Sequence, residues 1–120
     1  MKARSVRREV EWALERKLSS SQKKTFRRIA HHLDAVIQVG GQSVTEGVIA
    51  ETDRALRDHE LIKVRINSVA REERNTQTEE IVAACDAVLV QRIGKVAVLF
   101  RANPNADPRL SNLHRFADST

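Results

Sequence analysis

Two short stretches of the sequence contain residues whose types and spacing suit the binding of phosphate groups. The first is the loop Gly40, Gly41, Gln42 and Ser43, which lies between an apolar run and Thr45, a residue that favours the start of a helix. Glycines in such a loop let backbone N–H groups approach an anion closely, and the N-terminus of the following helix adds partial positive charge. Many purely structural turns have the same composition, so the pattern alone leaves both interpretations open.

The second stretch is a basic helix that precedes the loop. It carries Lys23, Lys24, Arg27 and Arg28, with His31 toward its C-terminal end. The pairs 23/27 and 24/28 place like charges four residues apart, which costs stability unless a polyanion offsets it. These side chains could flank the same groove as the loop and neutralise further phosphates of a nucleic-acid backbone. A solvated helix that only keeps the protein soluble is the alternative, and for His31 and its neighbour His32 phosphate contact and plain helix surface are equal alternatives.

Patterns that catalysis would need do not occur in the sequence. The glycine loop has neither the Lys-Ser/Thr ending of a P-loop nor the G-x-G-x-x-G spacing of a dinucleotide site. The four histidines form no metal-binding pair, and the single cysteine, Cys85, excludes an intramolecular disulfide and favours a buried, inert thiol. We therefore expect a protein that is not an enzyme, without cofactor, metal or small-molecule substrate; a small enzyme acting on RNA or nucleotides remains a remote alternative.

The distribution of charge points to a polyanionic partner. The chain of 120 residues has a net charge of +5, and residues 1–33 hold ten of its 21 Lys and Arg against three of its 16 Asp and Glu. Such asymmetry favours nucleic acid over a membrane surface, because the apolar face of the basic segment is modest. No apolar segment is long enough for a membrane span, and the first residues lack the pattern of a signal or transit peptide, so we expect a cytoplasmic protein.

Periodicity and capping residues predict the elements that hold these stretches. An N-terminal helix is expected over residues 4–18, and a second helix from the capping box of Ser19 and Gln22 to about Leu33, with Phe26 and Ile29 on its buried stripe. A short strand over 36–39 leads into the loop, and Thr45 caps the next helix. An alternating strand follows around Ile62 to Ile66 with Lys63 and Arg65 on its polar face.

The second half of the chain contains weaker signals and one clear hairpin. Residues 67–78 are polar and predicted to have little order, and a helix is expected over about Thr78 to Cys85. Two β-rich runs joined at Gly94 and Lys95 predict a type II′ hairpin, with Lys95 at its tip as a further candidate RNA contact. After Arg101 we expect a loosely held tail. The resulting fold class is α/β (α+β): one domain with a mixed four-stranded sheet packed with helices.

Several of these stretches, in this order, resemble a known family. L-S-S-S-Q-K-K-T-F-R-R-I-A-H-H-L, V-I-Q-V-G-G-Q-S-V-T-E-G-V-I-A-E, H-E-L-I-K-V-R-I and V-Q-R-I-G-K-V-A-V-L-F-R are similar to a CRM domain (chloroplast RNA splicing and ribosome maturation), above all to its stand-alone bacterial YhbY-like members. The resemblance covers about residues 18–102. It divides the chain into an N-terminal helical extension (1–17), a CRM-like domain (18–102) and a flexible C-terminal tail (103–120).

The resemblance implies a fold like the C-terminal domain of translation initiation factor three. It also implies RNA binding, with large-subunit rRNA or a pre-ribosomal particle as the partner. The family's G-x-x-G loop corresponds to Gly40 through Ser43, where serine replaces the last glycine, and its basic first helix corresponds to the run from Lys23 to Arg28. The alternative is a protein-interaction module in which the helix containing Trp12 docks a partner and the basic face is incidental.

Overall fold

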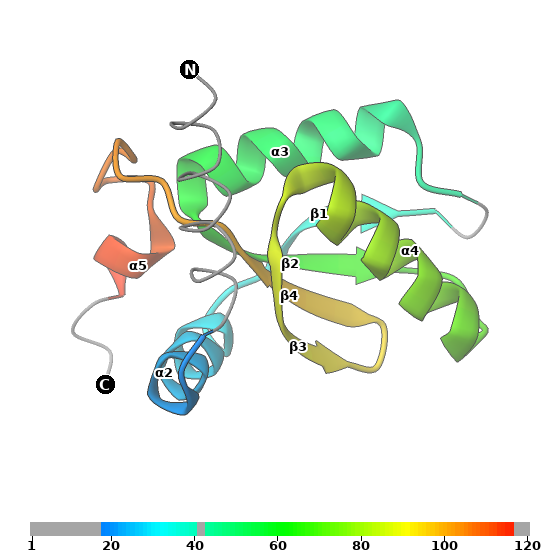
Figure 1. Ribbon diagram of the computed structural model, residues 1–120, viewed down its shortest axis with the longest axis horizontal. Helices are drawn as coiled ribbons and strands as arrows, with labels where there is room; N and C mark the ends of the chain where they lie inside the picture. The colour runs from blue at the N-terminus through cyan, green and yellow to red at the C-terminus, as the bar shows by residue number, and fades with distance from the viewer. Residues whose placement is uncertain (1–17, 41–42, 117–120) are drawn as a thin grey trace, which may run out of the picture.

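The computed structural model of the chain describes residues 18–40 and 43–116 (Figure 1). These residues form a mixed four-stranded sheet with helices packed on it, so the predicted fold class is confirmed. The predicted N-terminal helix, except for Leu18, lies outside the described residues, as do Gly41 and Gln42 of the loop.

The sheet combines one parallel and two antiparallel strand pairs. Its strands are β1 (Ala35–Val39), β2 (Leu61–Ile66), β3 (Val88–Ile93) and β4 (Val96–Phe100), in the order β1-β2-β4-β3. The pair β1–β2 is parallel, and α3 (Glu46–His59) connects the two strands; β2–β4 and β3–β4 are antiparallel. The C-terminal ends of β1 and β2 therefore lie at the same end of the sheet as the β3–β4 turn.

Helices cover both faces of the sheet (Figure 1). On one face, α3 and α4 (Arg71–Cys85) bury a cluster that includes Leu56, Ile81 and Val64. On the other face, α2 (Ser20–Ala30) and the short α5 (Asn112–Arg115) cover a second cluster that includes Phe26 and Phe100, whose ring centroids lie 4.6 Å apart. The predicted buried stripe of α2 is confirmed.

Local signals for the element boundaries proved accurate at three places. Ser19 and Gln22 form a reciprocal capping box, with N···O distances of 2.9 and 3.0 Å. The Thr45 hydroxyl accepts a hydrogen bond from the Val48 N–H at 3.1 Å and so caps α3. Gly94 has φ of +56°, the sign that a type II′ turn requires at its first central residue. The basic helix therefore has a well-defined start at Ser19, and the loop is followed by a well-defined helix start at Thr45.

The α2 face of the sheet is covered at one end only. There Leu61 pairs with Phe100, and both contribute to the cluster beneath α2. At the opposite end Arg65 pairs with Val96, Arg65 is exposed, and the neighbouring Ile93 is 57% exposed. The basic helix thus crosses the sheet near the start of β2, and the strand end that leads to the glycine loop is left uncovered.

The prediction of low order for residues 67–78 is wrong. Helix α4 begins at Arg71 rather than near Thr78, so most of the polar stretch is helical. The buried positions of this polar stretch are themselves polar. Gln77 accepts a hydrogen bond from the Ser68 hydroxyl at 2.7 Å, and the Thr78 hydroxyl donates to the Arg74 carbonyl at 2.7 Å. A helix that buries polar side chains on hydrogen bonds shows no apolar periodicity in its sequence.

The prediction of a loosely held tail after Arg101 is also corrected. Residues 103–116 pass the C-terminal end of α3 and end in α5, and Ser111 and Asn112 are buried. The Ser111 hydroxyl donates to Glu60 Oε2 at 2.5 Å, and the Asn112 amide donates to the Leu61 carbonyl at 2.7 Å. Hydrogen bonds between residues 51 positions apart hold this segment, so no pattern of neighbouring residues predicts it.

Candidate nucleic-acid interface

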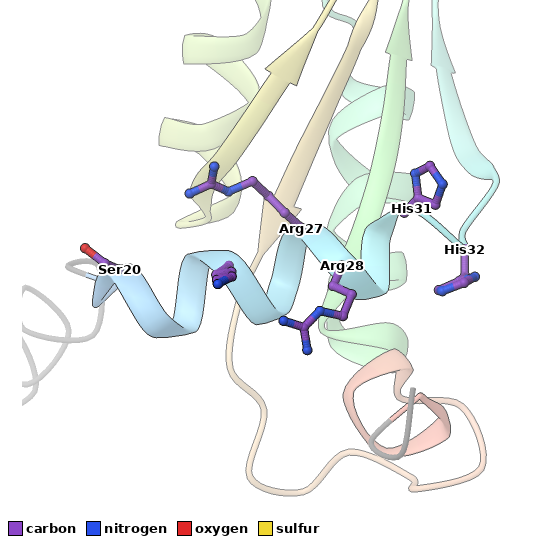
Figure 2. Close-up of a pocket in the computed structure, with 6 residues that line it drawn as sticks. Ser20, Arg27, Arg28, His31 and His32 are labelled. Carbon is purple, nitrogen blue, oxygen red and sulfur yellow. The ribbon is translucent and has the colours of Figure 1, made fainter. Parts of the chain in front are cut away.

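The exposed side of α2 forms a basic groove. The surface opening there has a volume of about 600 Å³, and its lining consists of Ser20, Lys24, Arg27, Arg28, His31 and His32. Figure 2 shows that Arg27 and Arg28 leave the helix in different directions, while His31 and His32 lie at its C-terminal end. The structure therefore brings four of the five predicted α2 residues together; Lys23 is exposed on the same helix but does not line the groove.

No negative charge neutralises this groove within the described part of the chain. The helix contains no acidic residue, none of the groove residues is acidic, and no ion pair between described residues involves α2. The Arg27 Nε donates to the Lys23 carbonyl at 3.3 Å, which leaves the rest of its guanidinium open. Unpaired guanidinium and ammonium groups on one exposed surface are suited to phosphate oxygens.

The described residues of the glycine loop are exposed. Gly40 is open to solvent: a Cβ placed there would meet nothing within 4 Å, and its φ lies outside the left-handed region. Ser43 is exposed as well, whereas the Thr45 hydroxyl is engaged in capping α3. Nothing in the fold itself therefore requires glycine at position 40, while Thr45 has a clear structural role.

The basic groove and the loop lie at opposite ends of β1. That strand starts shortly after His31 and ends at Val39, directly before Gly40. Five strand residues at about 3.3 Å each separate the two by roughly 16 Å. The expectation that both flank one groove is not what the described residues show, since neither Gly40 nor Ser43 lines the groove.

Lys95 lies at the loop end of the sheet. Its carbonyl accepts a hydrogen bond from the Ile66 N–H at 2.7 Å, and the next residue, Asn67, donates from its N–H to the Val39 carbonyl at 3.1 Å. These bonds place Lys95 at the end of the sheet that leads into the loop rather than at the end covered by α2. The Lys95 side chain is exposed. Of the two strand residues considered earlier, Arg65 is exposed, but Lys63 donates to the Leu33 carbonyl at 2.9 Å and so ties the sheet to the end of the α2 segment.

Sequence reasoning missed a second cluster of cations. Arg71 and Arg74 on α4 and Arg92 on β3 line an opening of about 330 Å³, together with Asn75 and Gly94. Arg92 lies 18 positions after Arg74 in the sequence, and residues 67–78 were not expected to be helical. Recognition of the helix start at residue 71 would have placed Arg71 and Arg74 three residues apart on one helix face.

The remaining chemical expectations concern the thiol and metal ligands. Cys85 is buried, 2% exposed, and burial followed by the charge of Asp53 raises the pKa of its thiol, which agrees with an inert thiol. Among the described residues, no three His, Cys, Asp or Glu side chains gather in a way that could hold a metal ion. No helix in that same part of the chain is long and apolar enough to cross a membrane.

Comparison with known proteins identifies relatives of this chain. The model of the CRS1 / YhbY (CRM) domain family matches residues 18–101. A Pseudomonas aeruginosa protein named "Probable RNA-binding protein" is 47% identical over 100 residues, which cover 83% of this chain and 96% of that protein. A Haemophilus influenzae protein named "RNA-binding protein" is 42% identical over 93 residues, 78% of this chain and 94% of that protein.

A solved structure supports the same relationship. The solution structure of a hypothetical protein from Staphylococcus aureus, described there as a candidate RNA-binding protein, superimposes with a TM-score of 0.67. The two chains are 30% identical, and the match covers 76% of this chain and 95% of the other. Helix α2, the loop and the hairpin all fall within the matched family range.

Proposed function

Because the chain belongs to the CRS1 / YhbY (CRM) domain family, a family of non-enzymatic RNA-binding domains, we propose that it binds RNA by gripping the phosphate backbone and assists assembly of the large ribosomal subunit or maturation of its rRNA. The observation that carries this proposal is the set of cations on the exposed side of α2, where none of the described residues that line the groove is acidic. The proposed partner is large-subunit rRNA or a pre-ribosomal particle in the cytoplasm.

The α2 groove is the principal phosphate contact. Lys24, Arg27 and Arg28 supply three permanent positive charges around one opening, and His31 adds a ring N–H donor at its end. Release of counterions from the RNA backbone then provides most of the binding free energy. Lys23, on the adjacent turn, extends the same positive surface along the helix.

The Gly40–Ser43 loop and Lys95 form a further contact at the other end of the sheet. Gly40 has open space where a side chain would stand, so a phosphate can come close to its backbone. The separation of roughly 16 Å from the groove requires an RNA that runs along the uncovered strand ends, past the exposed Arg65. Recognition by such a surface rests on RNA shape and phosphates, because aromatic residues, which could stack on bases, make up only 3% of the sequence.

The dependence of RNA affinity on salt tests the α2 contact. With four to six neutralised phosphates, a plot of log K against log[salt] should have a slope of about −3 to −5. Arg27→Gln with Arg28→Gln should reduce the size of that slope by about one to two, because two phosphate contacts are lost. Fluorescence anisotropy with a labelled fragment of large-subunit rRNA measures both the affinity and the slope.

A matched control is available on α3. Arg54→Gln with Arg57→Gln removes the same charge from two exposed positions that lie outside the groove. If this control flattens the slope as much as the α2 variant, only the net charge matters and the groove is not the site. An unchanged slope in the α2 variant would likewise remove α2 from the interface.

A further inference from the structure

Three arginines converge on the opening between α4 and the β3–β4 hairpin. Arg71 and Arg74 come from the first turns of α4, and Arg92 lies near the C-terminal end of β3, just before the hairpin turn. The opening has a volume of about 330 Å³, and the remaining lining residues are Asn75 and Gly94, neither of which is charged. The pocket therefore gathers three permanent positive charges, and none of the described residues in its wall is acidic.

The positive charge of this pocket is poorly neutralised by the surrounding residues. Arg92 Nη2 lies 3.9 Å from Glu79 Oε1, too far for a hydrogen bond, and the Glu79 side chain is 74% exposed. Glu72 and Glu73 occupy the first turn of α4 but do not line the opening. No ion pair of Arg71 is found among the described residues.

Arg74 is held in place by the backbone. Its Nη1 donates to the carbonyls of Ser68 and Val69 at 3.0 and 2.6 Å. These neutral carbonyls orient the guanidinium but do not cancel its charge. A fixed guanidinium beside two less constrained ones loses little side-chain entropy when an oxyanion binds, and the planar fork of each arginine matches phosphate oxygens.

The pocket is separate from the α2 groove in both face and position. Arg92 pairs in register with Ala97, and Ala97 belongs to the core cluster beneath α3 and α4, so Arg92 points to the face opposite α2. The pocket also lies at the hairpin end of the sheet, whereas α2 crosses the end where β2 begins (Figure 1). An RNA strand on the α2 face, including one that reaches Lys95, lies on the other side of the sheet from the Arg92 side chain.

We propose that the pocket of Arg71, Arg74 and Arg92 is a second phosphate-binding site, which holds a segment of RNA different from the segment bound by the α2 groove. The proposal rests on the proposed RNA-binding function and extends it: two sites on opposite faces let one protein molecule bring together two RNA segments that are distant in sequence. A protein of this kind stabilises a folded arrangement of RNA rather than marking a single sequence.

Nuclear magnetic resonance titration with a short uridine oligoribonucleotide at low salt tests the second site. In the wild-type protein, the backbone amides of residues 71–75 and 92–94 should shift together with those of α2. Arg71→Gln with Arg92→Gln should abolish the first set of shifts and leave the α2 shifts in place. Arg27→Gln with Arg28→Gln should do the reverse, and Arg54→Gln with Arg57→Gln should change neither set.

The outcomes separate this inference from the proposed function. If the α2 amides shift but residues 71–75 and 92–94 do not, the second site is refuted and RNA binding by the groove stands. If both sets disappear in the α2 variant, the pocket is not an independent site and the inference also fails. If no amides shift in the wild-type protein, both proposals fail. All substituted arginines are exposed. The thermal unfolding midpoint of each variant should equal that of the wild type, which checks that the variant is folded.

Discussion

Gly40 is a glycine that the described part of the fold does not require. Its surroundings leave room for a methyl group, and its backbone does not adopt a conformation that only glycine tolerates. By contrast, Gly94 has φ of +56° and is needed for the hairpin turn. The fold therefore requires a positive φ at position 94 and not at position 40, and the sequence alone does not distinguish the two glycines.

Gly40→Ala should weaken RNA binding without weakening the fold. Alanine restricts the unfolded chain, so the free energy of unfolding should stay equal or rise by up to about 1 kcal/mol. The added methyl group stands where the phosphate approaches, so affinity should fall. Urea unfolding and anisotropy measure the two effects, and Gly94→Ala is the contrast, with strain at its positive φ that lowers stability. Equal RNA affinity in Gly40→Ala would argue against the loop contact.

Cys85 makes a prediction about pH. Burial raises the pKa of its thiol above the ordinary value of 9.0, so the thiolate is disfavoured in the folded protein. The associated stability is fully present below the unfolded-state pKa and is lost as the pH rises from there through the folded-state pKa. Cys85→Ser should reduce this alkaline loss in unfolding experiments at pH values above 9.0. In the native wild-type protein, a thiol reagent at pH 8 should react only as fast as the protein opens.

At the scale of elements, local signals predicted what neighbouring residues control. The capping box at Ser19, the cap at Thr45 and the turn at Gly94 were all readable because each involves residues three or fewer positions apart. The first half of α4 was not readable, since its buried positions are the polar Gln77 and Thr78. Gln77 accepts a hydrogen bond from Ser68 before the helix, and the Thr78 hydroxyl donates to the Arg74 carbonyl within it, so no apolar stripe marks the inner face of this half of α4.

The C-terminal segment lacked any local signal for a different reason. It is held by Glu60, whose carboxylate accepts hydrogen bonds from the Asn103 N–H at 2.7 Å and from the Ser111 hydroxyl. Glu60 itself is buried at the end of α3 with φ of +60°. Contacts of this range become visible only when the fold places α3 beside the returning chain.

Ser111→Ala tests the attachment of this segment. The substitution leaves the buried Glu60 carboxylate with one hydrogen-bond donor fewer, so the free energy of unfolding should fall by about 1–3 kcal/mol. Ser43→Ala, at an exposed position, is the control and should change it by no more than about 0.5 kcal/mol. Urea denaturation measures both. A cost in Ser111→Ala no larger than in the control would mean that the segment contributes little to stability.

At the scale of the whole molecule, the fold distributes positive charge to two ends of one sheet. The α2 groove was predictable because Lys24, Arg27 and Arg28 lie within one turn or so of each other in sequence. The pocket of Arg71, Arg74 and Arg92 was not, because a helix and a hairpin had to be brought together first. The relative position of groove and loop was also beyond the sequence, since it depends on the direction in which β1 leaves α2.

Sedimentation of the protein in a cell lysate on a sucrose gradient is the most direct test of the central claim. At moderate salt, the wild-type protein should comigrate with free or precursor large ribosomal subunits, and high salt should release it because phosphate contacts are screened. Arg27→Gln with Arg28→Gln should shift the protein toward the top of the gradient, while Arg54→Gln with Arg57→Gln should not. Wild-type protein that stays at the top even at low salt would contradict a role in large-subunit assembly.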